Sequence, residues 1–165
     1  MIRGRIETDD DAIRRLNDAA FGGTAESKLV EDLRAAGLVA VELVAIDESA
    51  VIGHILFSEL TVTLDEDVVP ALSLAPMSVR PGRQNSGIGG ALVRAGLDLA
   101  KDGGWHAVIV LGHPGYYPRF GFSASRARPL KAPFSGDAFM AIELVTGALA
   151  GDSGLIRYPP PFGIA

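Results

Sequence analysis

Residues 71–111 constrain the fold most strongly, because they form in succession an apolar run, a glycine-rich loop, a helical pattern and a second apolar run. The runs 71–79 and 107–111 have the composition of buried strands, and the second carries no charge at all. Between them, residues 88–100 repeat apolar side chains at helical spacing. The segment therefore predicts a βαβ crossover, in which a helix joins two strands of one sheet.

The rest of the chain adds an antiparallel hairpin and two helices before this crossover. The hairpin is predicted from two β-branched and aromatic runs that flank the turn 47–49. The remaining predicted elements are strands at 2–7, 39–46, 51–64 and 139–145, helices at 8–20 and 24–36, and a helical turn at 116–120. This order predicts a single domain over residues 1–165 of the α/β (α+β) class, with a mixed central sheet flanked by helices on both faces.

Composition excludes several classes of protein. The 165 residues contain no cysteine, which excludes disulfides, cysteine zinc ligands and thiolate nucleophiles, and no metal site is predicted. The net charge of −5 argues against nonspecific binding to nucleic acid or to an anionic membrane. No signal peptide pattern and no run of about 18 apolar residues is present. We expect a cytoplasmic protein with no nucleic-acid or membrane partner.

The loop before the predicted helix has the features of an anion site. Gly87, Gly89 and Gly90 carry no Cβ, so a ligand can approach the backbone N–H groups at the start of the helix. Between Asp67 and Asp98 there are arginines but no acidic residue. Glycine-rich turns with arginines also occur on ordinary surfaces. The Rossmann pattern fails because Leu92 stands where a glycine or alanine is needed, and no Walker A motif is present.

Pro76 gives a second indication, because proline removes a hydrogen-bond donor from a strand. If the strand at 71–79 is internal, Pro76 marks a bulge or a place where neighbouring strands part, which would free the backbone at 77–79 for a ligand. If the strand is at an edge, Pro76 needs no further explanation.

Two motifs in this order resemble those of the GCN5-related N-acetyltransferases (GNAT). The run from Met77 to Leu92 contains Gln84, Gly87 and Gly89 in the pattern Gln/Arg-x-x-Gly-x-Gly/Ala of the family's acyl-CoA signature. The run 117–122, Tyr-Pro-Arg-Phe-Gly-Phe, is similar to the family's Tyr-x-x-x-Gly-Phe. Residues 110–117 look like one subgroup of acetyltransferases of unknown substrate. The predicted order of elements also matches that fold along most of the chain.

The resemblance implies that acetyl-CoA is the co-substrate. Its pyrophosphate would lie on the loop and the helix start, and its pantetheine arm would pair with the strand before the loop. The implied cofactor-binding residues are Met77, Ser78, Val79, Arg83, Gln84, Asn85, Ser86, Gly87, Ile88, Gly89, Gly90 and Tyr116. The implied reaction transfers the acetyl group to a primary amine of a small molecule or of a protein.

Tyr117 matches the family's usual general acid, which would protonate the leaving thiolate. Its aromatic ring can also serve packing beside Phe120 and Phe122. The base is open. His113, at the end of the strand 107–111, is the most attractive candidate, and the others are Glu42, His54 and Glu59, or a chain of water molecules.

The sequence does not identify the amine, since one fold hosts many acceptors. A non-catalytic acyl-CoA-binding regulatory module is the alternative function. A nucleotide-binding protein of another class is disfavoured by the failed Rossmann and Walker patterns. If the chain assembles, a homodimer is the default.

Overall fold

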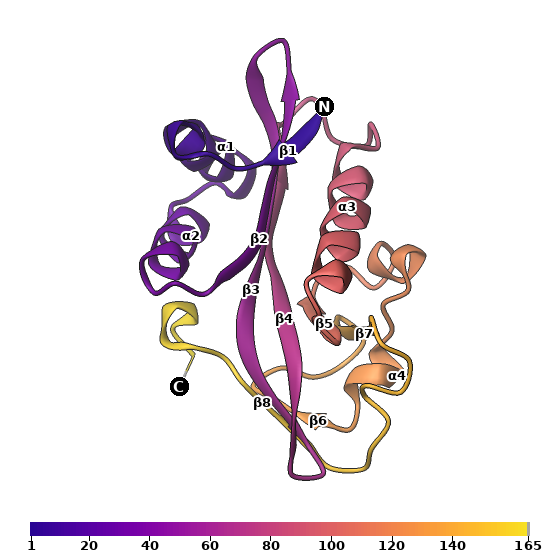
Figure 1. Ribbon diagram of the computed structural model, residues 1–165. Coiled ribbons are helices and arrows are strands. Elements are labelled where there is room, and N and C mark those ends of the chain that lie inside the picture. Colours follow the sequence, from indigo (N-terminus) through magenta and orange to yellow (C-terminus); the bar gives the residue numbers. More distant parts are fainter. Residues whose placement is uncertain (165) are drawn as a thin grey trace. The chain divides into compact units, whose positions relative to one another are not determined.

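The computed structural model describes residues 1–164, which divide into two compact units (Figure 1). The first unit combines residues 1–58 with residues 75–99, and the second combines residues 59–74 with the chain from Ala100 onward. Neither unit is a contiguous stretch of chain. A single domain over residues 1–165 stays a prediction.

The first unit contains two whole strands, parts of two further strands and three α-helices. In chain order these are β1 (Ile2–Gly4), α1 (Asp10–Phe21), α2 (Ala25–Ala35), β2 (Val39–Asp47), the first part of β3 (Ala50–Leu64), the end of β4 (Asp67–Val79) and α3 (Ile88–Asp102) up to Leu99. A short 3-10 helix, Glu7–Asp9, precedes α1. Strand β2 pairs antiparallel with both β1 and β3, and its residue Val44 lies opposite Arg3 and His54.

Helices cover both faces of this part of the sheet, as predicted (Figure 1). Gly53 faces α3, because a Cβ built there would lie 3.0 Å from side-chain atoms of Ile88 and Leu92. The next residue, His54, points to the opposite face, where its ring contacts Asn17 of α1. Successive residues of a strand alternate between faces, so the two contacts fix the orientation of β3.

The second unit mixes parallel and antiparallel pairs. It contains β5 (Ala107–Leu111), the 3-10 helix η2 (Tyr117–Phe120), α4 (Ala124–Ala127), β6 (Leu130–Lys131), β7 (Phe139–Glu143), β8 (Gly154–Arg157) and the 3-10 helix η3 (Pro160–Phe162). Strand β5 runs parallel to β4, with Leu72 opposite Val108, and antiparallel to β7, with Ile109 opposite Ala141. This confirms the predicted mixed sheet.

Strand β8 completes this unit by pairing antiparallel with the end of β3 and parallel with β6. Val62 and Ile156, which lie opposite each other, are both buried, as are Leu130, Phe139 and Leu149 around them. Strands β6 and β8 and helix α4 were not predicted, because elements of two to four residues leave no periodic pattern in the sequence.

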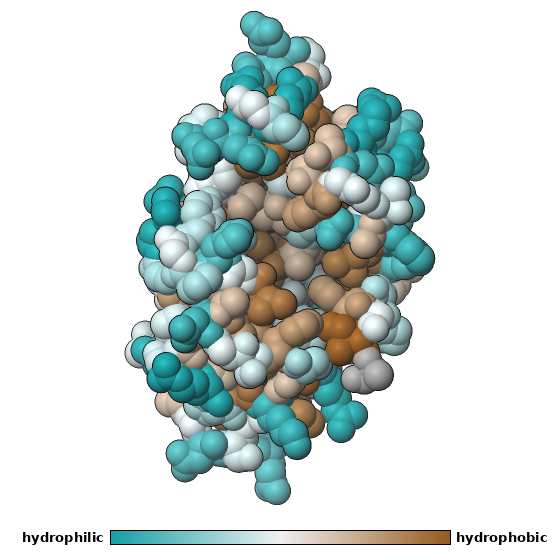
Figure 2. Space-filling model, turned by 180° about the vertical axis from the view of Figure 1, so that it is seen from behind, coloured by the Kyte–Doolittle hydropathy of each residue, from teal (hydrophilic) through white to brown (hydrophobic). Residues whose placement is uncertain are grey.

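Hydrophobic side chains reach the surface on the face shown in Figure 2, among hydrophilic neighbours. Within residues 1–164, no helix combines the length and the apolar composition needed to cross a bilayer.

Candidate functional site

A few backbone hydrogen bonds, together with residues in the left-handed backbone conformation, define the loop between β4 and α3. The N–H of Arg80 donates to the carbonyl of Ile52 at 2.8 Å, and the N–H of Arg83 donates to the carbonyl of Arg80 at 2.9 Å. Gly87 has a φ of 86°, a conformation that favours glycine, and helix α3 begins at the next residue. The chain therefore turns sharply into the helix.

This turn leaves a row of backbone donors unused. Among the described residues, no N–H group from Gln84 to Gly90 donates a hydrogen bond to another part of the chain. The first hydrogen bond of α3 runs from the N–H of Ala91 to the carbonyl of Gly87 at 3.0 Å. The first turn of α3 carries no acidic residue. Free N–H groups at the positive end of a helix suit a phosphate.

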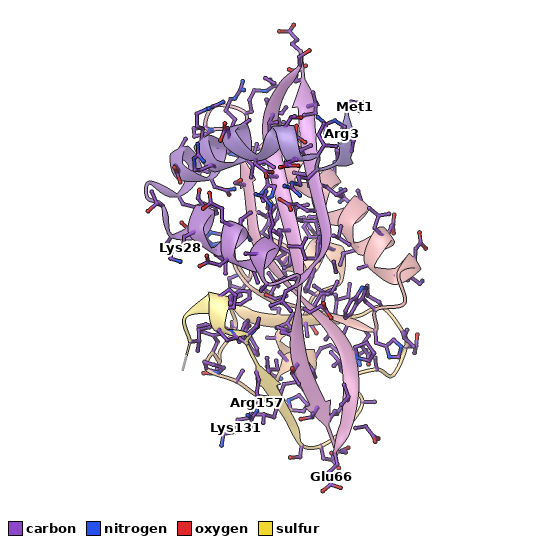
Figure 3. The ribbon with its side chains drawn as sticks, turned by 60° about the vertical axis from the view of Figure 1, so that its left-hand side comes forward. Met1, Arg3, Lys28, Glu66, Lys131 and Arg157 are labelled. Carbon is purple, nitrogen blue, oxygen red and sulfur yellow. The ribbon has the colours of Figure 1, made fainter. Side chains whose placement is uncertain are left out.

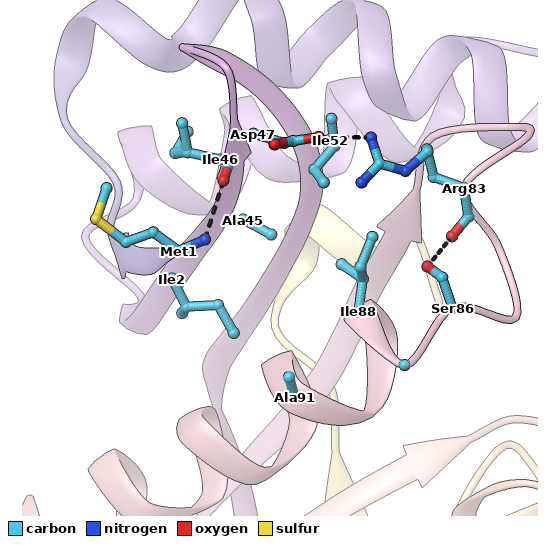
Figure 4. A pocket seen from close by; sticks show the side chains of 11 residues that line it. Met1, Ile2, Ala45, Ile46, Asp47, Ile52, Arg83, Ser86, Ile88 and Ala91 are labelled. Atoms are coloured by element: carbon cyan, nitrogen blue, oxygen red, sulfur yellow. Dashed lines mark hydrogen bonds and ion pairs between the residues drawn. The ribbon is translucent and has the colours of Figure 1, made fainter.

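Polar side chains of the loop brace it. The Gln84 amide donates to the carbonyl of Val79 at 3.3 Å, and the Ser86 hydroxyl donates to the carbonyl of Arg83. The Arg83 guanidinium lies 2.8 Å from the Asp47 carboxylate on the neighbouring hairpin (Figure 4). Both partners of this ion pair are partly exposed. Arg83, predicted to bind the cofactor, is thus paired with Asp47 in this structure.

A cavity of about 310 Å³ lies beside the loop (Figure 4). Its walls combine aliphatic side chains with the loop itself, and they include Ile2, Ile46, Ile52, Arg83, Ser86 and Ile88. The Met1 ammonium closes one edge by donating to the carbonyl of Ile46 at 3.0 Å. The cavity therefore joins an apolar surface to the donor-rich loop.

The strand before the loop contributes one polar group without a partner. Met77 is half-buried, whereas Ser78 and Val79 are buried. The Ser78 hydroxyl makes no hydrogen bond with any described residue. A buried hydroxyl without a partner is uncommon in native structures, so Ser78 is available to a ligand that reaches this strand. The predicted parting of this strand from the next stays a prediction.

In the second unit, Tyr117 is buried in an aromatic cluster. Its ring lies 5.2 Å from that of Tyr116 and 5.7 Å from that of Phe122, both in edge-to-face geometry. Gly112 makes room for it, because a Cβ there would lie 2.4 Å from the Tyr117 ring. Gly121, with a φ of 103°, ends η2. These glycines give the Tyr-x-x-x-Gly-Phe motif its local structure.

The Tyr117 hydroxyl is protonated at neutral pH and makes no hydrogen bond to any described residue. Burial, aided by the nearby Tyr116, raises the pKa of Tyr117 to about 12. A phenol in this state can donate a proton but does not accept one. Tyr117 therefore packs its ring in the aromatic cluster and still has a hydroxyl that is free to bind a ligand.

His113 and Tyr116 lie in the same turn as Tyr117. The carbonyl of His113 accepts hydrogen bonds from the N–H groups of Tyr116 and Tyr117, at 3.0 and 3.3 Å. The His113 side chain is exposed, with no hydrogen bond in the part of the chain that the structure describes. The Arg119 guanidinium stacks over the Tyr116 ring, 4.6 Å from its centre. The turn thus brings the three predicted residues together.

Two other candidate bases are bound to each other in the first unit. The Nε2 atom of His54 lies 2.8 Å from the carboxylate of Glu42, and Arg34 of α2 donates to the same carboxylate, at 2.5 Å from Oε2. The Asn17 amide lies 3.3 Å from Nδ1 of His54 and also donates to the carbonyl of Ile13. Since an amide nitrogen only donates, Nδ1 accepts and the ring proton lies on Nε2, facing Glu42.

This network occupies Glu42 and His54. Burial alone would raise the pKa of Glu42, but the hydrogen bonds from His54 and Arg34 together outweigh it and lower the pKa to about 2. His54 is fully buried, and both of its ring nitrogens have partners. Neither residue is free to take a proton from a substrate. The sequence signal for this network was Glu42 itself, the one charge that interrupts the apolar run 39–46.

Glu59, the last candidate, is exposed on β3. Nowhere in residues 1–164 do three or more His, Asp or Glu side chains gather in a way that could hold a metal ion.

Comparison with known proteins identifies the family of the chain. A family model described as an acetyltransferase (GNAT) domain matches residues 2–125. YhbS of Escherichia coli K12, an uncharacterized N-acetyltransferase, is 36% identical over 98% of both chains. The crystal structure of E. coli YhbS in complex with CoA matches with a TM-score of 0.89 and 35% identity, covering 99% of this chain and 92% of that one.

A GNAT family acetyltransferase from Brucella melitensis, crystallised with acetyl-CoA, matches with a TM-score of 0.79 and 33% identity, over 98% of this chain and 97% of that one. The family match covers the whole of the loop and Tyr117. The chain belongs to the GNAT family of acetyltransferases, as the motifs at Gln84 and Tyr117 predicted.

Proposed function

We propose that this protein transfers the acetyl group of acetyl-CoA to a primary amine, of a small molecule or of a protein. The observation that carries the proposal is the row of unused N–H groups from Gln84 to Gly90, placed at the start of α3. This row suits a pyrophosphate, and CoA carries a pyrophosphate in addition to its 3′-phosphate. The CoA and acetyl-CoA complexes of the two relatives support the same ligand.

In the proposed reaction the neutral amine attacks the thioester carbonyl and forms a tetrahedral oxyanion. Collapse of this intermediate breaks the carbon–sulfur bond and releases the CoA thiolate. A proton leaves the amine nitrogen, and one is delivered to the sulfur. In this proposal Tyr117 delivers it, because a pKa of about 12 keeps the hydroxyl protonated at neutral pH, as a general acid must be.

His113 takes the proton of the amine or contacts the acceptor in this proposal. Its exposed side chain follows β5 directly and lies in the turn that carries Tyr117. Glu42 and His54 are left out, because each is held by the other. Water is the remaining route for this proton.

The first test is calorimetric titration with acetyl-CoA, with CoA and ATP as comparisons. We expect acetyl-CoA and CoA to bind and ATP to bind weakly. Gly87→Ala should weaken acetyl-CoA binding, and Gly104→Ala is its matched control. Both glycines have a φ of 86° and neither would meet an atom within 4 Å of an added Cβ, so the backbone strain is the same. Equal affinity of the two variants would refute the assignment of the loop.

The second test separates an enzyme from a non-catalytic CoA-binding module. Thiol release is followed with a panel of alkylamines, amino acids and lysine-containing peptides. Tyr117→Phe should retain acetyl-CoA affinity and lose most of the turnover with any accepted amine. Binding without turnover across the panel would favour the module. A loss at His113→Gln that alkaline pH restores would support His113 as the base.

A further inference from the structure

A second cavity, of about 500 Å³, lies in the second unit, and none of its lining residues belongs to the loop 80–90 or to the Tyr117 turn. It is lined by both strands of the β6–β8 pair and by the end of the chain. The residues that matter here are the cations Lys131 and Arg157 and the apolar Ala132, Pro133, Leu155 and Ile164. A cavity of this volume is typical of sites for small molecules.

The two cations lie on one face of the β6–β8 pair. Lys131 pairs with Leu155 in the parallel ladder, and Arg157 follows Leu155 by two residues, which returns it to the same face. Figure 3 shows the two side chains close together at the same end of this unit. Both are exposed, and neither forms an ion pair or a side-chain hydrogen bond within the described chain.

No acidic side chain lines the cavity. The nearest acidic residue on that face of β3 is Glu59, two residues before Thr61, which lies opposite Arg157, and no ion pair joins Glu59 to Arg157. In contrast, Arg126 of the same unit is paired with Glu143 at 3.0 Å. In a chain with a net charge of −5, two neighbouring unpaired cations form a local positive site.

The floor of the cavity is apolar and firmly supported. Ring contacts at 5.6 and 5.0 Å join Tyr158 to Phe134 and to Phe162, and they hold the final turn of the chain that supplies Ile164. Tyr158 also lines the cavity, and burial raises its pKa to about 12, so that its hydroxyl stays a donor. Apolar walls below two cations and a phenol match an amphiphilic anion.

We propose that this cavity binds a small organic carboxylate whose body is an aryl or branched alkyl group. The carboxylate lies between Lys131 and Arg157, and the apolar body lies on Leu155, Ala132 and Ile164. The fork of donors on a guanidinium suits a carboxylate, and the ammonium adds a second charge-assisted hydrogen bond. This binding does not depend on the proposed acetyl transfer.

The test is calorimetric titration of the full chain with 3-phenylpropionate. 3-Phenylpropan-1-ol has the same body without the charge, and phenethylamine has the opposite charge. We expect the carboxylate to bind at least about tenfold more tightly than the alcohol, the effect of charge-assisted hydrogen bonds. The amine should bind more weakly than either.

The variant Lys131→Gln/Arg157→Gln should reduce the carboxylate affinity to that of the alcohol. Lys101→Gln/Arg128→Gln is the matched control, since it removes two exposed cations of the same unit that do not line the cavity. Ala132→Phe, which fills the cavity, should abolish binding of both ligands. Equal binding of carboxylate and alcohol by the native chain, or unchanged carboxylate binding in the Lys131/Arg157 variant, would overturn the proposal.

Discussion

A Cβ atom on Gly112 would lie 2.4 Å from Cε2 of the Tyr117 ring. That distance is far below van der Waals contact, so even alanine at 112 must displace the ring. Gly112 is itself fixed, because its N–H donates to the carbonyl of Ala138 at 2.9 Å. The place of the Tyr117 hydroxyl therefore depends on the missing side chain at 112.

If Tyr117 is the general acid, as proposed, Gly112→Ala should lower kcat at least tenfold and leave acetyl-CoA affinity within about twofold, because a small displacement of a catalytic group is costly. Steady-state kinetics and calorimetry measure the two quantities. Gly115→Ala is the control, since a Cβ there meets nothing within 4 Å. Full activity of Gly112→Ala would show that the position of Tyr117 is unimportant.

Gly96 and Phe57 form a similar pair in the first unit, where a Cβ on Gly96 would lie 2.2 Å from the Phe57 ring. Alanine normally stabilises a helix interior relative to glycine. Here Gly96→Ala should instead lower the free energy of unfolding by about 1–3 kcal/mol, the cost of overpacking. Denaturant unfolding measures this change.

Phe57→Leu supplies the internal check on that prediction. Combined with Gly96→Ala it should destabilise less than the sum of the single changes, because the smaller side chain yields the space. Strict additivity would contradict a direct clash.

The Glu42 carboxylate makes the free energy of unfolding depend on pH in the acid range. Its pKa is lowered from 4.5 to about 2 in the folded chain, so its contribution is complete above about pH 4.5 and disappears as the pH falls toward 2. The contribution is about 3 kcal/mol. Denaturant unfolding measures this. At pH 7 the free energy of unfolding of Glu42→Gln should lie well below that of the native chain, and at pH 3 the two values should be closer.

Asp32→Asn is the matched control for Glu42→Gln, because it removes the carboxylate of the exposed Lys28–Asp32 pair. Its unfolding midpoint should stay close to that of the native chain at both pH values. If the free energy of unfolding of Glu42→Gln stays below that of the native chain by the same amount from pH 7 to pH 3, the charge of Glu42 is not the cause of the difference.

The Arg83–Asp47 pair competes with any phosphate for the arginine. Asp47→Asn should release Arg83 and strengthen CoA binding by about two- to fivefold, the value of an exposed ion pair. Calorimetry at low salt measures the change, which should shrink in added salt. In an Arg83→Gln background the same substitution should have no effect. Weaker CoA binding in Asp47→Asn would show that the pair holds the loop in its competent form.

The sequence predicted the long elements, in which a pattern of apolar residues extends over many positions. The crossover 71–111 and the hairpin have clear periods, and glycine and proline marked their ends. The strand predicted at 71–79 begins earlier, at Asp67, and its first residues escaped prediction because Asp67 and Pro70 interrupt the apolar run. On α3, Leu99 is 47% exposed although it follows the apolar repeat of the helix, because the buried face runs through Val93 and Leu97.

The loop was predictable because backbone donors depend on glycine positions that are visible in the sequence. The pairing of His54 with Glu42 was not, because it joins residues of two strands through a register that no local pattern reveals. The same holds for Lys131 and Arg157, which stand far apart in the sequence and meet on one face of two short strands.

The interleaving of the two units has a consequence for synthesis on the ribosome. The first unit is complete once residue 99 has emerged, but residues 59–74 then still lack their partners. That stretch includes Val62, Leu64, Val69 and Leu72, all buried in the finished chain. They remain uncovered until β5, β7 and finally β8 are made. If the ribosome pauses after residue 99, the nascent chain therefore exposes an apolar, aggregation-prone hairpin. In this form a nascent chain most needs a chaperone.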